Sequence, residues 1–449
     1  MRFDDLATYT ALVQPYRAQG KFDCRSYFRE PINNDLIGRT SIAQSKANGN
    51  PMHDILIIGG GAVGLSLAWE LLRRGASVQL VCDSAGHPAA SWAGAGILPP
   101  APEFPSEKSS YSGGNENARA ALQSSVINQA IRASQDPYLQ LCSLSHQLHA
   151  IWASDLVRAT GIDTGYARCG GLYLATTRGE LATLAANTLW WDEHHIAHEQ
   201  IDTDALIRLE PALAATAGDY VGAWRLADEC QIRNPDHLAA LRKACLLEGL
   251  DLQEDCVAGE LIKAGNRVIG ARSTSGAEFK ASQTVICSGA WSRLAMDSVA
   301  APTGIFPVRG QMLLYKLPAP AFQHVINEGN RYLVCRADGH LLAGSVEEEA
   351  GYVVETTDEA IASIRDWAES IMPQLTNAPL KKSWAGLRPG SFDGFPYMGP
   401  VASLGGLFLA SGHFRSGLHL SPGTAVVMAD LLTGKTPAID LTPFRPGRG

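Results

Sequence analysis

Long apolar stretches are missing from this sequence of 449 residues, and none reaches the length of about 20 residues that a membrane-spanning helix needs. The chain also lacks a basic stripe with interleaved aromatic residues. It has 37 lysines and arginines against 45 acidic residues, and only 7% of its residues are aromatic. We therefore expect neither a membrane span nor a nucleic-acid partner. Because no apolar signal segment is found near the N-terminus, we expect a cytoplasmic protein.

Patterns typical of metal sites and of disulfide frameworks are missing as well. The nine cysteines are scattered, without a CxxC pair and without a cluster of histidine and cysteine. An odd, dispersed set of this kind is typical of buried, reduced thiols and favours a reducing compartment. The sequence therefore predicts no metal site.

Residues 1–51 differ from the rest of the chain. They show no helical periodicity and end in a turn-rich linker, and acidic residues make them unlike a transit peptide. Met52 stands directly before the first predicted strand. Two interpretations stay open: the natural protein starts at Met52, or the segment is a genuine, poorly ordered extension.

What the sequence does contain is a glycine-rich turn after an apolar run. Residues 55–58 are isoleucine or leucine and predict a parallel strand buried on both faces. Gly59, Gly61 and Gly64 follow with GxGxxG spacing. In such a motif the glycines permit a tight turn, a close approach to a pyrophosphate, and close packing of a helix on the strand. The motif alone is weak evidence, but its place directly after a strand makes a dinucleotide site the favoured interpretation.

A helix and a second strand complete the expected unit. Helical spacing of apolar residues extends from 63 to 74, Gly75 stands where a helix typically ends, and residues 78–81 predict the strand. The positive end of this helix would face the phosphates. Asp83 is expected to accept hydrogen bonds from the ribose, although Cys82 occupies the usual place of that acid.

Later segments predict a discontinuous nucleotide domain and a second sheet. Small residues at 91–98 would let the backbone pass close to a bulky group, although an ordinary loop is the plain alternative. A buried strand at 284–287 that ends in Ser288 and Gly289 belongs near the ligand crevice. Residues 306–315, 332–335 and 340–345 predict antiparallel strands. Polar residues at 103–116 predict an exposed loop or lid, and helices are expected over residues 124–156, 180–191, 236–247, 359–372 and 423–432.

Two arginines lie in glycine-rich stretches near the C-terminus. Arg388 stands in Gly386-Leu387-Arg388-Pro389, and Arg415 in Gly412-His413-Phe414-Arg415-Ser416-Gly417. A guanidinium group forms a fork that matches a carboxylate. Taken alone, each arginine is more often part of a surface ion pair.

The glycine-rich turn and these two C-terminal motifs, in this order, resemble the D-amino-acid oxidase superfamily of FAD flavoproteins, and within it the glycine oxidases of thiamine biosynthesis. The resemblance covers residues 52–433. It implies an α/β fold with a Rossmann-type FAD-binding domain and a substrate-binding domain built on an antiparallel sheet. We expect residues 1–51 to be a poorly ordered extension, residues 52–150, 220–300 and 380–449 to form the FAD-binding domain, and residues 151–219 and 301–379 to form the substrate-binding domain.

The resemblance also implies roles for individual residues. Arg388 would bind the substrate carboxylate, Tyr332 would donate its hydroxyl, and Arg415 would lie nearby. No cysteine follows Cys335, so FAD is expected to be bound non-covalently. The residues expected to contact FAD are Gly59, Gly61, Ala62, Val63, Gly64, Asp83, Ser91, Trp92, Gly96, Val257, Ser288, Gly289, Gly412, His413, Phe414, Arg415, Ser416 and Gly417.

The reaction implied is hydride transfer from the α-carbon of glycine or a small amino acid to flavin N5, with oxygen as the acceptor and hydrogen peroxide as product. A D-amino-acid or sarcosine-type dehydrogenase that uses another electron acceptor is the alternative, and a flavin-binding subunit whose partner does the chemistry is a third. Relatives are often homo-oligomers. Glu347 departs from the pattern because glycine oxidases carry an apolar residue there. It either lies on a solvated turn or faces the pocket, where it would favour a basic substrate.

Overall fold

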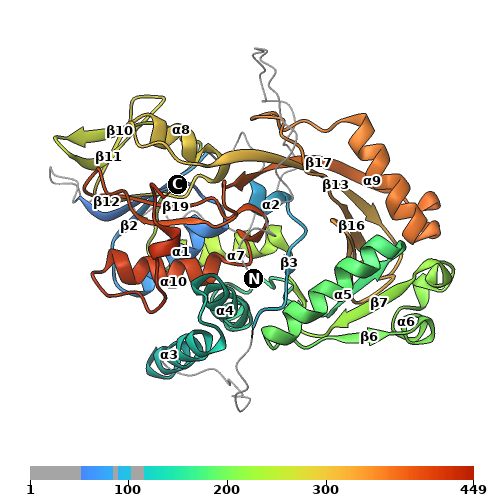
Figure 1. The fold of residues 1–449 in the computed structure, drawn as a ribbon. Helices are drawn as coiled ribbons and strands as arrows, with labels where there is room; N and C mark the ends of the chain where they lie inside the picture. Colours follow the sequence, from blue (N-terminus) through green and yellow to red (C-terminus); the bar gives the residue numbers. More distant parts are fainter. Residues whose placement is uncertain (1–51, 84–88, 103–115, 449) are drawn as a thin grey trace. The chain divides into compact units, whose positions relative to one another are not determined.

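Parallel strands form the centre of the first of two large sheets in this structure (Figure 1). The computed structural model describes residues 52–83, 89–102 and 116–448. Residues 1–51, and most of the polar loop expected at 103–116, lie outside the described residues. The parallel strands, in spatial order, are β19 (Leu407–Ser411), β12 (Glu278–Ile286), β1 (His53–Ile58), β2 (Val78–Val81) and β9 (Asp251–Gln253).

The register makes four of these strands end at the same level. Ile58, the end of β1, lies opposite Val81 and Ile286, and Val81 lies opposite Gln253, the end of β9, while β19 continues two residues beyond Leu409, the partner of Ile286. The turns that follow these strands therefore gather at one edge of the sheet. In open α/β sheets, that carboxyl edge is where ligands bind.

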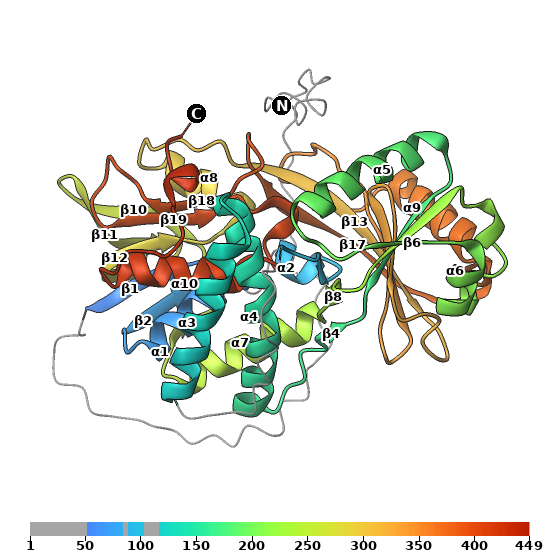
Figure 2. The ribbon, with the colours of Figure 1, turned by 60° about the horizontal axis from the view of Figure 1, so that its bottom comes forward.

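Both faces of this sheet are buried, as its apolar first strand predicts. Ile55 and Ile57 pack with a layer of helices, while Leu56 and Ile58 pack on the opposite face. Figure 2 shows this helix layer beside the sheet. Its members are α1 (Ala62–Arg73), α3 (Glu116–Ala133), α4 (Pro137–Thr160), α7 (Asn234–Leu247) and α10 (Ser421–Leu432). The other side carries β10 (Ala258–Ala264), β11 (Arg267–Ser273), α8 (Ser292–Asp297) and β18 (Tyr397–Pro400).

The single helix expected over residues 124–156 is wrong, because the chain forms two helices there, α3 and α4. Asp136 caps α4: its carboxylate accepts a hydrogen bond of 2.7 Å from the Tyr138 backbone N–H. Pro137 is the first residue of α4, where the missing N–H of proline costs nothing. The Asp-Pro pair could have been recognised as a helix start from the sequence.

The second large sheet is antiparallel except where β14 meets β5. Helix α9 (Asp358–Ile371) packs on one of its faces. The expected division places residues 220–300 and 380–449 in the nucleotide domain, yet β7 and β17 belong to this sheet; the domain boundaries stay a prediction. In spatial order the strands are β17 (Leu380–Gly390), β13 (Phe306–Lys316), β16 (His340–Gly344), β15 (Arg331–Cys335), β14 (Val325–Glu328), β5 (Gly171–Ala175), β7 (Gly222–Leu226) and β6 (Glu199–Ile201).

Shorter elements complete the described residues. Trp191 is buried, and its neighbour Trp190 is 43% exposed, so the core contains only one of this pair. In the part of the chain that is described, no helix is both long and apolar enough to cross a membrane. The elements are a small sheet of β3 (Ile97–Leu98), β8 (Cys230–Gln231) and β4 (Ala167–Arg168), the helices α2 (Ala90–Ala93), α5 (Arg178–Glu193) and α6 (Thr203–Leu209), and the 3-10 turns η2 (Pro211–Leu213), η3 (Ala217–Asp219), η4 (Gly289–Trp291), η5 (Pro373–Asn377), η6 (Phe414–Ser416) and η7 (Thr442–Phe444).

Four histidine rings meet inside the helix layer. The rings of His146 and His419 are 6.0 Å apart, as are those of His149 and His237, and His149 stacks on His419 at 6.3 Å. Burial lowers the pKa of His146 and of His149 to about 4 and that of His237 to about 3, and it holds the pKa of His419 well below its usual value. These imidazoles are therefore neutral in the folded protein at neutral pH.

We predict that the free energy of unfolding falls as the pH drops from about 6.5 to 4. The buried imidazoles stay neutral while the unfolded chain takes up protons, so acid favours unfolding by up to about 1.4 kcal/mol per histidine for each pH unit in this range. Glu229 acts in the opposite direction, because burial raises its pKa to about 7, but it is a single group. Chemical denaturation at pH 7, 6 and 5 measures the effect.

A matched pair of variants tests the cause. Neither ring nitrogen of His237 has a hydrogen-bond partner among the residues that the structure describes, so His237→Phe should make the pH dependence less steep. The exposed His195→Asn should leave it unchanged. A free energy of unfolding that is the same at pH 7 and pH 5 would contradict neutral, buried histidines.

Candidate active site

The glycine-rich turn fits tightly between β1 and its neighbours. A Cβ atom on Gly59, whose φ is +118°, would lie 2.5 Å from the Cys287 carbonyl oxygen, and one on Gly64 would lie 1.9 Å from the Gly59 carbonyl oxygen. Packing alone therefore requires these two glycines. A Cβ atom on Gly61 would meet only the Ser91 hydroxyl, at 3.2 Å. The room beside Gly61 is what a closely approaching phosphate group needs.

The N-terminus of α1 is suited to an anion. Gly61 is the residue before the helix and provides no side-chain cap, and the Ala62 N–H donates to the Ser91 hydroxyl at 2.9 Å. Val63 lies in the first turn, where backbone N–H groups point outward and the helix dipole is positive. At the other end of the helix, Gly75 has a φ of +84° and closes α1 as expected.

Asp83 and Val257 lie beside the same edge. Asp83 follows β2 by two residues, and the Cys82 carbonyl accepts a hydrogen bond of 3.0 Å from the Cys256 N–H. Val257, the next residue, is 46% exposed. Burial raises the pKa of Cys82 to about 11, so this thiol stays protonated and is a poor nucleophile.

Carbonyl groups of residues 91–96 are bound by the rest of the protein. The Asn234 amide donates to the carbonyls of Ser91 and Gly94 at 2.7 and 3.0 Å. The Trp384 indole donates to the Ala93 carbonyl at 2.9 Å, and its ring contacts that of Trp92 edge-on, with the ring centres 5.7 Å apart. This segment is therefore fixed, and not an ordinary loop.

Gly96 has no room for a side chain. Its φ is +74°, and a Cβ atom there would lie 1.9 Å from the Ile232 carbonyl oxygen. The Ile232 N–H in turn donates to the Gly96 carbonyl at 2.8 Å. Close packing thus accounts for the glycine, and it holds the segment against the strand that precedes α7.

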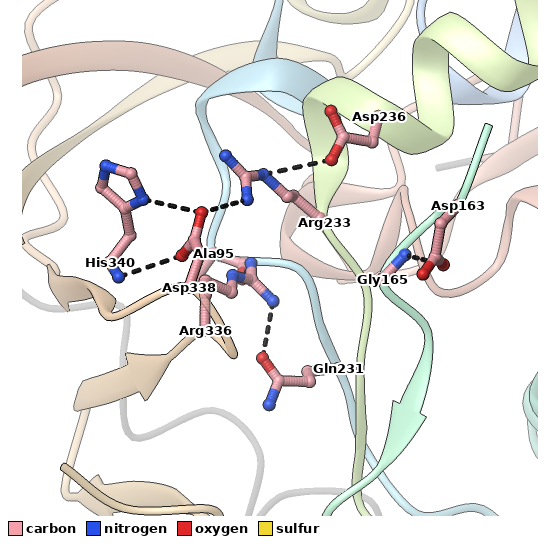
Figure 3. Close-up of polar contacts among 9 residues, drawn as sticks. All are labelled: Ala95, Asp163, Gly165, Gln231, Arg233, Asp236, Arg336, Asp338 and His340. Atoms are coloured by element: carbon pink, nitrogen blue, oxygen red, sulfur yellow. Dashed lines mark hydrogen bonds and ion pairs between the residues drawn. The ribbon is translucent and has the colours of Figure 1, made fainter. Parts of the chain in front are cut away.

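Arg336, which follows β15, reaches this segment from the second sheet (Figure 3). Its guanidinium group donates to the Ala95 carbonyl at 2.6 Å and to the Gln231 side chain at 2.7 Å. Burial lowers the pKa of Arg336 to about 10, so the group is still charged at neutral pH. A buried cation thereby joins the second sheet to the segment beside the glycine-rich turn.

An ion pair beside Arg336 fixes the same junction. Arg233, directly before α7, donates to the Asp338 carboxylate at 2.7 Å, and the His340 backbone N–H donates to it at 3.1 Å (Figure 3). Burial alone would raise the pKa of Asp338, but the hydrogen bonds from Arg233 and His340 outweigh it and hold that pKa well below its usual value. Sequence reasoning missed this cluster and Asn234. The Asn-Pro pair at the start of α7 was the only local signal.

A chain of hydroxyl groups connects Ser288 and Gly289 with the C-terminal glycine-rich loop. The hydroxyl groups of Ser288 and Ser292 are 3.4 Å apart, and the Ser292 hydroxyl donates to that of Ser411 at 2.9 Å. The Ser411 hydroxyl donates to the Gly289 carbonyl at 3.0 Å. Gly412, which follows Ser411, therefore lies beside the turns that end β12 and β1.

Within this loop, two side chains are held by helices of the first domain. The His413 ring is buried and contacts the Thr424 hydroxyl at 3.0 Å, and burial lowers its pKa to about 3. The Ser416 hydroxyl lies 3.5 Å from that of Tyr138. Phe414 has a φ of +49°, an unusual value for a residue other than glycine that is found mostly at functional sites. The backbone of residues 412–417 and the side chains of Phe414 and Arg415 are therefore the parts of the loop that these two contacts do not involve.

Arg388 and Tyr332 both lie near the end of β16. The Arg388 guanidinium donates to the Ser345 hydroxyl at 2.6 Å and to the Val346 carbonyl at 3.0 Å. It lies over Gly310, where a Cβ atom would come within 2.4 Å of it. Tyr332 pairs with Gly344, directly before Ser345. The two residues expected to bind a carboxylate therefore lie near the same strand end, and the Tyr332 hydroxyl donates to Met312 Sδ at 3.4 Å.

Arg415 lies at the same place and is bound to Glu347. Its Nε atom donates to Glu347 Oε1 at 2.5 Å, and 37% and 31% of the two side chains are exposed. Glu347 therefore faces Arg415 and remains partly exposed to solvent. No group of three or more histidine, cysteine, aspartate or glutamate residues among those described is placed to hold a metal ion.

Residues 54–431 match the family described as FAD dependent oxidoreductase, DAO. The chain belongs to this family. Glycine oxidase of Pseudomonas putida is 32% identical over 87% of this chain and 98% of its own length. Hydrogen cyanide synthase subunit HcnC of Pseudomonas aeruginosa is 29% identical over 89% of this chain and 97% of its own.

The solved structures agree with the family. The crystal structure of glycine oxidase from Geobacillus kaustophilus has a TM-score of 0.74 and 28% identity, and the match covers 88% of this chain and 99% of that one. The expected fold, with a parallel-dominated sheet and a largely antiparallel second sheet, is confirmed. Membership of a family of FAD-dependent oxidoreductases implies FAD as the cofactor, and the turn around Gly61 fits its diphosphate.

We predict that Gly61→Ala weakens FAD binding at least about tenfold without unfolding the protein. The added methyl group has room in the protein but enters the space beside the N–H groups of α1, where a diphosphate would lie. The ratio of flavin to protein absorbance after dialysis measures retention. Gly179→Ala is the control, because a Cβ atom there meets only Thr177, at 3.9 Å. Full retention of flavin by the Gly61 variant would contradict this placement.

Proposed function

We propose that the protein catalyses the oxidative deamination of glycine or another small amino acid, with oxygen as acceptor and hydrogen peroxide as product. The observation that carries the proposal is the placement of Arg388, whose guanidinium is held between Ser345, Val346 and Gly310 on the sheet that also carries Tyr332. Relatives of about 30% identity that are named glycine oxidase support the substrate class. Each terminal nitrogen of Arg388 has a second N–H beyond the one that it gives to Val346 or Ser345, so the group can still bind a carboxylate.

Orientation is the main task of the protein in this reaction. Arg388 binds the carboxylate of the amino acid, the Tyr332 hydroxyl donates a hydrogen bond to it, and the α-carbon is thereby aimed at the cofactor. When bound, FAD supplies the two-electron acceptor for the α-hydrogen and its electron pair. The amine must be neutral, and no side chain has to remove a proton from carbon. The imine that results hydrolyses to an oxo acid and ammonia.

We further propose that FAD is bound without a covalent bond. The cysteines nearest the glycine-rich turn are protonated, because burial raises the pKa of Cys82 to about 11 and that of Cys287 to about 12. No cysteine follows Cys335, so the C-terminal loop cannot form a thioether. Release of all flavin into the supernatant on acid precipitation is the expected result.

Anaerobic mixing with glycine, sarcosine, D-alanine and D-proline tests the reaction. We expect glycine or another of these small amines to bleach the flavin absorbance, and hydrogen peroxide to appear when air is admitted. Bleaching without peroxide would favour the dehydrogenase alternative. Flavin that none of these amines bleaches would contradict small-amine oxidation.

We predict that Arg388→Lys lowers kcat/KM for the preferred amine about 100-fold. Lysine keeps the charge but loses the fork that binds and orients a carboxylate. Arg331→Lys is the matched control, since Arg331 lies on the same sheet and its guanidinium binds Ser363 of α9. Stopped-flow bleaching at varied amine concentration separates binding from chemistry. An unchanged kcat/KM in the Arg388 variant would rule out the clamp.

A further inference from the structure

The segment that follows β16 contacts both arginines of the candidate site. Arg388 binds the Val346 carbonyl at 3.0 Å, and Arg415 binds the carboxylate of Glu347, the next residue, at 2.5 Å. The two guanidinium groups therefore lie on consecutive residues of one extended segment. A ligand whose carboxylate is held by Arg388 lies within reach of Arg415 through a short chain.

The rest of the segment is fixed from the second sheet. Glu348 accepts hydrogen bonds from Arg309 Nε and from the Gln311 amide, both at 2.8 Å. The backbones of Arg309 and Glu348 also pair, with N–O distances of 2.8 and 3.0 Å. Both the carboxylate and the backbone of Glu348 are thus bound within the protein, and Arg309 balances its charge. Among the described residues, Arg415 binds the carboxylate of Glu347, and this arginine belongs to the candidate site.

We propose that Glu347 occupies a second carboxylate subsite, formed by Arg415, and thereby restricts the enzyme to amines with a single carboxylate. The proposal rests on the proposed function, because Arg388 is assumed to receive the first carboxylate. Glu347 is then a specificity-determining residue. Its carboxylate takes the position beside Arg415 that the second carboxylate of a dicarboxylic amine would otherwise take.

Charge matching is the physical basis. Arg388 and Arg415 carry two positive charges, and Glu347 leaves a net charge of one, which a monocarboxylate with a neutral amine balances. A dicarboxylate would have to displace Glu347 and remain close to it, and like charges in such proximity disfavour binding. Glu347 is part of the protein chain, so its carboxylate has a high effective concentration beside Arg415. A free ligand must compete with it for that arginine.

Exposure keeps this arrangement adjustable. About a third of each side chain of the Arg415–Glu347 pair is in contact with solvent, so the pair is of the kind that contributes little to stability. Removing the glutamate charge should therefore change ligand preference and leave the fold intact. The Arg415 guanidinium would then be available to an anionic ligand.

Binding of two non-oxidisable ligands to the flavin-loaded protein tests the proposal. Methoxyacetate has the shape of N-methylglycine with oxygen in place of nitrogen and one carboxylate, and diglycolate is its dicarboxylate counterpart. We expect Glu347→Gln to tighten the Kd of diglycolate about tenfold in isothermal titration calorimetry, and to change that of methoxyacetate less than about threefold. Oxidation of iminodiacetate relative to sarcosine should rise in parallel.

Two controls separate a local contact from a general change of charge. Glu349→Gln removes the same charge two residues away, from an exposed side chain, and should leave both Kd values unchanged. Glu347→Gln combined with Arg415→Gln should abolish the gain for diglycolate. A Glu347→Ala variant shows whether the gain depends on charge alone, and it should tighten diglycolate at least as much.

The outcomes distinguish this proposal from the proposed function. If the unaltered protein binds methoxyacetate but Glu347→Gln leaves the ratio of the two Kd values unchanged, the second subsite is wrong and the function stands. If Glu349→Gln tightens the Kd of diglycolate as much, the gain comes from the general loss of a negative charge. The second subsite is then also wrong. If the unaltered protein and the Glu347 variants bind neither ligand, the carboxylate clamp of Arg388 fails, and both proposals fail with it.

Discussion

Close backbone packing at the β1–α1 turn is the constraint on which the candidate site depends. Gly64 lies against the Gly59 carbonyl, and Gly59 lies against the Cys287 carbonyl, at distances that leave no space for any side chain. This packing places the N-terminus of α1 directly over the ends of β1 and β12. The positive end of the helix dipole and the N–H groups of the first turn of α1 then face one edge of the sheet. The turns that follow β2, β12 and β19 lie at the same edge.

The second requirement is that the two sheets keep a fixed relation across this edge. Arg336 and Trp384 extend from the strands of the second sheet to carbonyls of residues 91–96, and Asn234 binds the same segment from α7. The segment beside the cofactor site is therefore shared between the two parts of the fold. The substrate clamp proposed at Arg388 on β17 would require that its own sheet be held in this way.

The sequence predicted what is locally encoded and missed what depends on distant contacts. The GxGxxG turn, the end of α1 at Gly75 and the strand at residues 55–58 all follow from short patterns, and they were found. The break at Pro137 was also local but was overridden by apolar periodicity. Asn234, Arg336 and the pair of Arg415 with Glu347 join residues up to 241 positions apart, so no local pattern could have placed them. The family resemblance supplied Arg388 and Tyr332, which spacing alone would not have singled out.

The charge of the candidate site follows from which groups the fold keeps neutral. Burial makes His413 a neutral residue down to a pH of about 3, although it is the neighbour of Phe414 and Arg415 in the C-terminal loop. The histidines inside the helix layer are neutral for the same reason. The positive charge that this loop offers to a ligand is therefore that of Arg415. Glu347 lies beside Arg415 because it belongs to the segment whose backbone Arg388 binds. Under the proposal made above, this glutamate determines whether the charge of Arg415 is available to a substrate.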